Sequence, residues 1–233
     1  MHFIMFGPPG SGKGTYASRL GPQLGGLAHI ATGDIFRAMA KGDGPLSEEI
    51  KSYLVKGVLV PDEIVLPIVR EELAKPVAQK GFFLDGFPRN LNQAKELEQM
   101  TTIDAVLHLI VPQEILVEKA LARRICRDCG NMYNIADISR TIDGVSYILP
   151  PMSPEVAGKC DKCGGELYQR EDDNEAVIRD RLQIYENQSK PVMQYLRERG
   201  VRFLDVYVIR PPEEMVAKIR QQLEEAGLVP KSQ

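Results

Sequence analysis

A glycine-rich segment near the start of the chain constrains the fold more than any other feature. It reads Gly7-Pro8-Pro9-Gly10-Ser11-Gly12-Lys13-Gly14-Thr15, follows the apolar run His2–Phe6 and precedes a helical pattern that reaches Leu24. This order of strand, glycine-rich turn and helix is typical of a phosphate-binding loop. Glycine lets backbone N–H groups turn inward, and the helix N-terminus attracts anions. We expect Lys13 to contact the outer phosphates of a nucleotide. The alternative is a glycine-rich connection that binds no ligand.

The residue after Lys13 departs from the strict form of this loop. A Ser or Thr normally follows the lysine and binds magnesium through its hydroxyl. Here Gly14 follows, and Thr15 comes one place later. Magnesium keeps several waters when it binds, since it dehydrates reluctantly. We therefore expect the metal to be held mainly by phosphates and water.

The remainder of the chain alternates between short apolar runs and helical patterns. The apolar runs predict strands at residues 2–6, 28–31, 82–85, 105–111 and 201–206. Helical patterns occupy residues 12–24, 34–41, 47–56, 90–99, 112–124, 174–187, 191–199 and 212–226, and a further helix opens at Pro61. Such alternation is typical of an α/β fold, and uninterrupted apolar runs fit strands buried on both faces. We predict a parallel five-stranded core sheet flanked by helices.

Residues from Cys126 to about Arg170 break the alternation and contain all four cysteines. The cysteines form two matched pairs, Cys126-x-x-Cys129-Gly130 and Cys160-x-x-Cys163-Gly164. Four thiolates at this spacing make a closed tetrahedral metal site, and the glycines permit turns that aim backbone N–H groups at sulfur. Zinc is the first choice, while iron and cobalt also fit a tetrathiolate. Two disulfides and four free thiols are the alternatives.

We interpret the metal as structural, because all four ligands come from the protein and no position is left for a substrate. Metal-binding energy would then hold together a lid that is too small to fold around its own core. A zinc ribbon that binds nucleic acid is another alternative, but it requires a basic face. This segment instead mixes Asp128, Asp137, Asp143, Glu155 and Asp161 with Arg127, Arg140, Lys159 and Lys162.

Charge and hydropathy narrow the class of protein. The net charge of −3 provides no basic excess for nucleic acid. No apolar run approaches the roughly 20 residues that a transmembrane helix needs, and the N-terminal run is too short for a signal peptide. We therefore expect a cytoplasmic protein without membrane or nucleic-acid partners. Nothing in the sequence requires an oligomer, so a monomer is the default expectation.

Four motifs together resemble the adenylate kinases, a family of nucleoside monophosphate kinases. The loop has that family's Gly-Lys-Gly-Thr variant, and Ala31-Thr32-Gly33-Asp34-Ile35-Phe36-Arg37 is similar to its AMP-binding segment. Leu84-Asp85-Gly86-Phe87-Pro88-Arg89 with Gln93 resembles its second substrate motif, and Arg170-Glu171-Asp172-Asp173 with Arg179 and Arg181 resembles its lid-closing motif. The motifs span nearly the whole chain in the family's order. The resemblance implies reversible phosphoryl transfer from ATP to AMP, giving ADP, with Mg²⁺ and a metal-binding lid.

The resemblance assigns site residues motif by motif. The catalytic residues would be Lys13, Arg89, Arg123, Arg170, Arg181 and Asp85, the last holding magnesium through water. The residues that bind ATP would be Gly10, Ser11, Gly12, Lys13, Gly14, Thr15, Lys119, Arg123 and Arg210. Those that bind AMP would be Thr32, Gly33, Arg37, Val58, Leu59, Val60, Gly86, Arg89, Gln93, Arg170 and Arg181. So many cations suit phosphoryl transfer, because negative charge is spread over the phosphoryl oxygens in its transition state.

Three of these residues also have plainer interpretations. Asp85 could cap a turn, and Arg37 taken alone could be a solvated surface arginine. Lys119 stands where the family usually has an arginine that stacks on the adenine of ATP. An ammonium lacks the flat face of a guanidinium, so the stacking role would pass to Arg123 or to the aliphatic stem of the lysine.

The resemblance also implies three parts: a core of residues 1–31, 61–122 and 173–233, an AMP-binding helical insertion of residues 32–60, and a lid of residues 123–172. The span between the cysteine pairs is longer than in most metal-binding lids of the family. Its middle, from about Ser139 to Glu155, is therefore either a mobile loop or an added hairpin. Two other functions stay open, namely a kinase for another nucleoside monophosphate and a nucleotide- or metal-sensing module without turnover.

Overall fold

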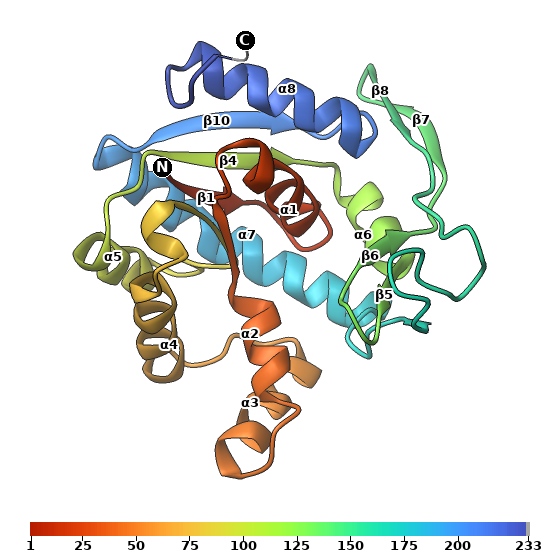
Figure 1. Cartoon of the computed structure of the whole chain (residues 1–233), viewed down its shortest axis with the longest axis horizontal. Coiled ribbons are helices and arrows are strands. Elements are labelled where there is room, and N and C mark those ends of the chain that lie inside the picture. Colours follow the sequence, from red (N-terminus) through yellow and green to blue (C-terminus); the bar gives the residue numbers. More distant parts are fainter. Residues whose placement is uncertain (232–233) are drawn as a thin grey trace.

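A parallel sheet forms the centre of the computed structural model, which describes residues 1–231 (Figure 1). Its strands are β1 (His2–Phe6), β2 (Ala28–Ala31), β3 (Phe82–Asp85), β4 (Ala105–Ile110) and β10 (Arg202–Tyr207). They pair in the order β10-β4-β1-β3-β2, and every pairing is parallel. The predicted fold class is confirmed, and each core strand lies within one residue of its predicted bounds.

Helices cover both faces of this sheet and extend away from one end of it (Figure 1). They are α1 (Lys13–Gln23), α2 (Thr32–Met39), α3 (Pro45–Lys56), α4 (Asp62–Ala74), the short 3-10 helix η1 (Ala78–Lys80), α5 (Leu91–Met100), α6 (Gln113–Leu121), α7 (Glu175–Glu198) and α8 (Pro212–Glu225). Asn90 caps α5, since its side-chain oxygen accepts the N–H of Gln93 at 2.8 Å. Among residues 1–231, no helix is both long enough and apolar enough to cross a bilayer.

Two helix predictions were wrong at their ends. Separate helices were predicted at residues 174–187 and 191–199, whereas α7 runs through Pro191 without a break. Proline removes one helical hydrogen bond, but α7 buries Leu182 before the proline and Val192 after it, so packing on both sides holds the helix together. The helix predicted to reach residue 124 ends at Leu121, because the chain then enters the first strand of the lid.

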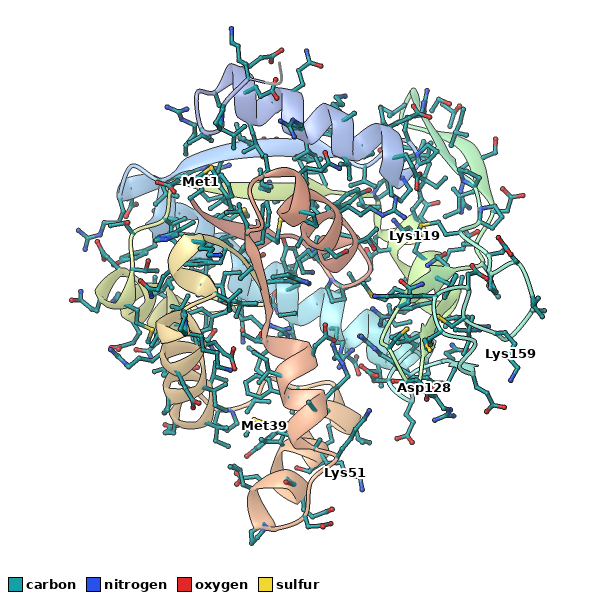
Figure 2. The ribbon with its side chains drawn as sticks, in the orientation of Figure 1. Met1, Met39, Lys51, Lys119, Asp128 and Lys159 are labelled. Atoms are coloured by element: carbon teal, nitrogen blue, oxygen red, sulfur yellow. The ribbon has the colours of Figure 1, made fainter. Side chains whose placement is uncertain are left out.

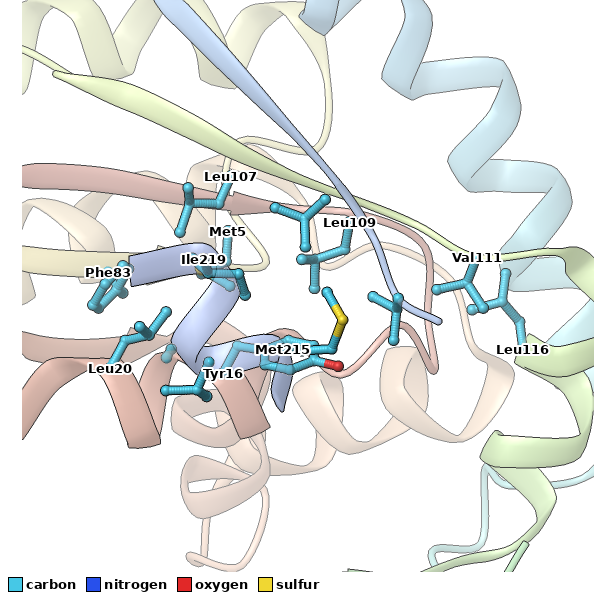
Figure 3. Packing of buried hydrophobic residues seen from close by; sticks show 14 of the residues in the cluster. Met5, Tyr16, Leu20, Phe83, Leu107, Leu109, Val111, Leu116, Met215 and Ile219 are labelled. Carbon is cyan, nitrogen blue, oxygen red and sulfur yellow. The ribbon is translucent and has the colours of Figure 1, made fainter. Parts of the chain in front are cut away.

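The core lies on both faces of the sheet because successive strand residues point in opposite directions. On β1, Phe3 and Met5 face the layer formed by α1 and α8, which Figure 3 shows with Tyr16, Met215 and Ile219. The residues between them, Ile4 and Phe6, face the layer formed by α4, α5 and α7. Burial on both faces holds the carboxyl end of β1 rigidly, and the glycine-rich loop begins there.

The lid contains two small antiparallel sheets. The first has the order β6-β5-β9 and consists of β5 (Arg123–Cys126), β6 (Met132–Asn134) and β9 (Leu167–Tyr168). The second is a hairpin of β7 (Ile138–Ile142) and β8 (Val145–Leu149), so the long excursion between the cysteine pairs is an added hairpin. Beside the first sheet lies a separate cluster of three buried residues, Cys126, Tyr133 and Cys160, with the partly buried Leu167 packed against it. Such a cluster is too small to fold a lid without further support.

The packing around β4 generates a stability prediction. Leu107 is fully buried, so Leu107→Ala should lower the free energy of unfolding by about 2–5 kcal/mol through lost burial and the cavity left behind. Urea unfolding would measure the change. The control Val77→Ala removes an exposed side chain and should change stability by less than about 0.5 kcal/mol. Equal effects of the two substitutions would contradict this assignment of the core.

Candidate active site

A cavity of about 300 Å³ lies at the carboxyl ends of β1 and β3, between the glycine-rich loop, α2, α3 and the lid. Ligands of open α/β sheets bind at this end of the strands. Every residue predicted to bind nucleotide lines the cavity except Ser11 and Arg210. The structure therefore brings together motifs that are separated by more than a hundred residues in the sequence.

The glycine-rich loop has the backbone of an anion-binding loop. Gly10 and Gly12 have φ values of +84° and +95°, and a Cβ at Gly10 would lie 2.9 Å from the carbonyl oxygen of Leu116. Only glycine fits this conformation and this close approach. The Lys13 ammonium donates to the carbonyls of Gly7 at 2.8 Å and Pro8 at 3.0 Å. Lys13 is thus folded over the loop, where an outer phosphate can replace the carbonyls as its partner.

Ser11 lies inside the loop rather than in the cavity wall. Its side chain is buried, and its hydroxyl oxygen has no hydrogen-bond partner among residues 1–231. A buried hydroxyl without a partner is costly. Its role in ATP binding therefore stays a prediction that depends on the ligand supplying the partner.

Asp85 lies beside the phosphate loop, near Lys13, and is ionised. Its carboxylate oxygen lies 3.4 Å from Nε2 of His29. Burial alone would raise the pKa of Asp85, but the His29 hydrogen bond and the positive charges of Lys13 and Arg89 outweigh it, and the pKa is lowered. In turn burial lowers the pKa of Lys13 to about 8, although Asp85 opposes this shift. An ionised carboxylate beside the phosphate loop suits a hydrated magnesium ion.

Four arginines of the cavity wall are held by three carboxylates. Arg123 donates Nε and Nη2 to Asp173, with the Nε bond at 2.9 Å, and Arg181 is paired with Asp172. Arg37 and Arg170 share one oxygen of Asp34, at 2.5 and 3.4 Å. These pairs orient the guanidinium groups before any phosphate arrives. The carboxylates belong to the sequence motifs, but the sequence alone predicts no role for them.

The arginines of this cluster carry more positive charge than the nearby carboxylates neutralise, so the cluster favours an anion. Burial, together with the nearby Arg181 and Arg37, lowers the pKa of Arg89 to about 10. The pKa of Arg170 is also lowered to about 10, by burial and then by Arg123 and Arg37. The Nε of Arg170 is buried and has no partner among residues 1–231. Guanidinium groups crowded in this way are stabilised by a bound phosphate, which accepts their free N–H groups.

Hydrogen bonds connect the two motifs on the α2 side of the cavity. The Thr32 hydroxyl donates to the carbonyl of Gly86 at 3.0 Å. The buried amide of Gln93 accepts the backbone N–H of Arg89 at 2.8 Å and donates to Asp62 at 2.7 Å. One N–H and one lone pair of this amide remain for a ligand, so Gln93 both positions Arg89 and can still contact a base.

Lys119 and Arg210 lie in different surroundings. Lys119 lines the cavity, where its position on α6 is labelled in Figure 2, and burial lowers its pKa to about 8. Arg210 lies outside the cavity wall, and its Nη1 donates to the carbonyls of Ser146 at 2.7 Å and Ile209 at 2.9 Å. The structure thus engages Arg210 with the lid hairpin, and direct contact with ATP stays a prediction.

Sequence reasoning missed several residues of the cavity wall. On α7, Tyr185 and Gln188 face the cavity, and their spacing of three residues on one helix face was the available signal. In the lid, Met132, Asn134 and Met152 also line the cavity. No sequence signal identified Met152, because only the folding of the long excursion brings it back to this wall.

The four cysteine sulfurs form one cluster in the lid. They all lie within 4.8 Å of one another and could hold a metal ion. The Sγ–Sγ distances of 3.4 Å for Cys126–Cys163 and 3.6 Å for Cys129–Cys160 are much longer than the roughly 2 Å of a disulfide bond. The cysteines are unbridged, and the fold gives them the compact arrangement of a tetrathiolate site.

The electrostatics of this cluster also favour a cation. The Tyr133 hydroxyl is the largest of the contacts that lower the pKa of the Cys160 thiol to about 6. For Cys163 the backbone N–H of Gly165 favours the thiolate, but the sulfurs of Cys129 and Cys126 outweigh it and raise the pKa to about 12. One thiolate therefore forms easily, but its negative charge opposes the ionisation of the neighbouring thiols. A divalent cation removes that repulsion.

Comparisons with known proteins agree with this geometry. The family model of adenylate kinase matches residues 5–201. An adenylate kinase of Symbiobacterium thermophilum is 42% identical over 229 residues, which cover 95% of this chain and 97% of the relative. An adenylate kinase of Archaeoglobus fulgidus is 44% identical over 209 residues, covering 87% and 89%, and one of Syntrophotalea carbinolica is 45% identical over 206 residues, covering 86% and 88%. On these matches the chain, a phosphotransferase, belongs to the adenylate kinase family.

Proposed function

We propose that the chain transfers the terminal phosphoryl group of ATP to AMP and catalyses the reverse reaction between two ADP molecules. One observation carries the proposal: a single cavity holds a phosphate loop and a further set of arginines, Arg37, Arg89, Arg123, Arg170 and Arg181. A protein that binds one nucleotide does not need this many cations. Two polyphosphate chains that meet end to end do need them.

Positioning and charge supply most of the catalysis in this mechanism. The glycine-rich loop and Lys13 would hold ATP, while Arg37 and Arg89 would hold the phosphate of AMP. Arg123 and Arg170 would reach the transferred group and stabilise the negative charge spread over its oxygens. An AMP phosphate oxygen is already anionic, so no general base is required. The carboxylates Asp34, Asp172 and Asp173 would orient the arginines until phosphate replaces or supplements them.

Closure of the chain around the substrates is the second part of the proposal. We assign residues 1–31, 61–122 and 173–233 to a core, residues 32–60 to an AMP-binding segment and residues 123–172 to a lid. The AMP segment and the lid would close over the cavity and exclude water, which could otherwise accept the phosphoryl group. The position of α2, α3 and the lid strands on different sides of the cavity supports this division (Figure 1).

Two metal ions have separate roles in the proposal. Adenylate kinases use Mg²⁺ with ATP, and Asp85 would hold its water shell while the ion draws charge from the phosphates. The lid metal would be zinc, held by Cys126, Cys129, Cys160 and Cys163, since a closed tetrathiolate is its usual structural site. Iron and cobalt are the alternatives for the lid. We further propose a monomer that acts in the cytoplasm.

The residues around Thr32 and Gln93 favour AMP over other monophosphates by their resemblance to the family motifs. A coupled assay with ATP and each of AMP, UMP, CMP and GMP, with and without magnesium, would test this. AMP should be the best acceptor, and turnover should require magnesium. A nucleotide- or metal-sensing module would bind ATP without converting any acceptor.

The phosphate loop generates the first prediction for activity. Lys13→Met should lower kcat by at least about 10²–10³-fold, because the fixed cation at the outer phosphates is lost. The exposed Lys218→Met on α8 is the matched control and should keep wild-type turnover. Thermal melting would verify that both variants fold. Wild-type rates in folded Lys13→Met would contradict the role of the loop.

Removal of the lid metal generates the second prediction. Metal-free protein should melt at least about 5–10 °C lower than the metal-bound form, since metal binding contributes folding energy to a lid with only a small core. Metal analysis should find one ion per chain in the native protein and none in Cys129→Ser. Returning zinc should restore the melting temperature of the wild type but not of the variant. An unchanged melting temperature after metal removal would show that metal binding by the cysteine cluster does not stabilise the fold.

A further inference from the structure

The hairpin between the cysteine pairs begins and ends beside the cavity. Before the hairpin Asn134 lies in the cavity wall, and after it Met152 lies there too. These two residues pair, with the N–H of Met152 donating to the carbonyl of Asn134 at 2.7 Å and the reverse bond at 3.2 Å. The excursion therefore returns to its own starting point and adds one apolar side chain, that of Met152, to the wall.

The hairpin is fastened to the core rather than extended into solvent. Ile138, Tyr147 and Leu149 are buried in the core cluster that includes residues of α6 and α8. The N–H of Ile148 donates to the carbonyl of Ile209 at 3.1 Å. Figure 1 shows β7 and β8 beside α8, away from the cysteine-bearing part of the lid. This packing keeps the position of the hairpin fixed relative to the sheet.

Arg210 connects the hairpin to the segment before α8, which also reaches the cavity wall. It lies in the connection between β10 and α8 and donates to the carbonyl of Ser146 at the start of β8. Pro212, two residues later, lines the cavity. The hairpin and this connection are thus one unit, which presents Met152 and Pro212 to the cavity.

These residues lie in the compartment opposite the one proposed for AMP. Figure 1 shows two groups of elements around the cavity: α2, α4 and α5 lie toward the left and bottom, and α6 with the lid strands lies toward the right. Thr32 and Gln93 lie on the first side, in α2 and α5, whereas Lys119 lies on the second side, in α6, and Met152 pairs there with Asn134 of β6. If AMP occupies the first side, the base of ATP must occupy the second, so the inference rests on the proposed function. A thioether makes favourable contacts with an aromatic ring, and the apolar stem of a lysine can cover its face.

Lys119 lines the same side of the cavity as Met152 and adds a polar group to it. Its ammonium makes no hydrogen bond or ion pair with any residue in the described part of the chain, and burial lowers its pKa to about 8. An ammonium at the cavity wall without a protein partner can donate its N–H groups to an acceptor on the ligand. The acceptor atoms of a purine base or of a ribose provide one.

We infer that Met152 and the stem of Lys119 enclose the base of ATP, and that the hairpin, anchored by Arg210, holds Met152 in place. Arg210 is then a positioning residue, which acts through Met152 and makes no direct contact with ATP. In this inference the hairpin contributes to ATP binding, whereas the cysteine site contributes to the stability of the lid.

Direct binding measurements test this inference independently of turnover. Titration calorimetry should show that Met152→Ala weakens ATP binding about tenfold, because an apolar contact with the base is lost, and changes AMP binding less than about twofold. Met152→Leu keeps the apolar volume and should bind ATP nearly as the wild type does. Val145→Ala, at the exposed start of β8, is the matched control and should change neither affinity. Unchanged ATP affinity in folded Met152→Ala, or equal weakening of ATP and AMP, would overturn the inference.

A double variant tests the positioning role of Arg210. If Arg210 acts through Met152, Arg210→Met should weaken ATP binding in the wild type but add little to Met152→Ala. Arg210→Lys keeps a donor for the Ser146 carbonyl and should restore most of the affinity. Additive effects of the two substitutions would show that Arg210 contacts ATP itself and would overturn the anchoring role. Absence of turnover in a wild type that binds ATP as described would instead count against the proposed function alone.

Discussion

Concentrated positive charge around one cavity is the constraint on which the rest of the site depends. Lys13 and Arg89 are buried deeply enough that their pKa values fall to about 8 and about 10, and both still face other cations. Burial without compensation would be destabilising, so the fold places Asp85 beside Lys13 and pairs other arginines with Asp34, Asp172 and Asp173. These pairs hold the arginines ready without satisfying them completely. A polyphosphate provides the missing charge, which is why the site favours nucleotides.

The lid is supported in two different ways. Around the cysteines the separate buried cluster consists of Cys126, Tyr133 and Cys160, so a metal held by the four thiolates would provide the support that a larger hydrophobic core gives elsewhere. The hairpin is supported differently, since Tyr147 and Leu149 pack into the core of the main sheet. One lid therefore contains a part built around the cysteine cluster and a part stabilised by the core. This contrast explains how the long excursion is ordered although it lies far from the cysteines.

Much of the fold could be predicted from local sequence. The apolar runs located all five core strands, because strands buried on both faces have a continuous apolar pattern. The cysteine spacing predicted the cluster, because two residues between thiolates fix their separation. Helix ends were less predictable: Pro191 predicted a break that tertiary packing of α7 removes. The carboxylate partners of the arginines and the return of Met152 to the cavity depend on three-dimensional contacts, and no local pattern encodes them.

The central claim is that one cavity holds two nucleotides at the same time. Calorimetric titration of the wild-type protein with AMP, before and after saturation with a non-hydrolysable ATP analogue and magnesium, measures this most directly. The account predicts one AMP site per chain in both titrations, with AMP binding at least as tightly to the saturated protein. Displacement of the analogue by AMP, or loss of AMP binding after saturation, would show that the nucleotides share a single site and would contradict the account.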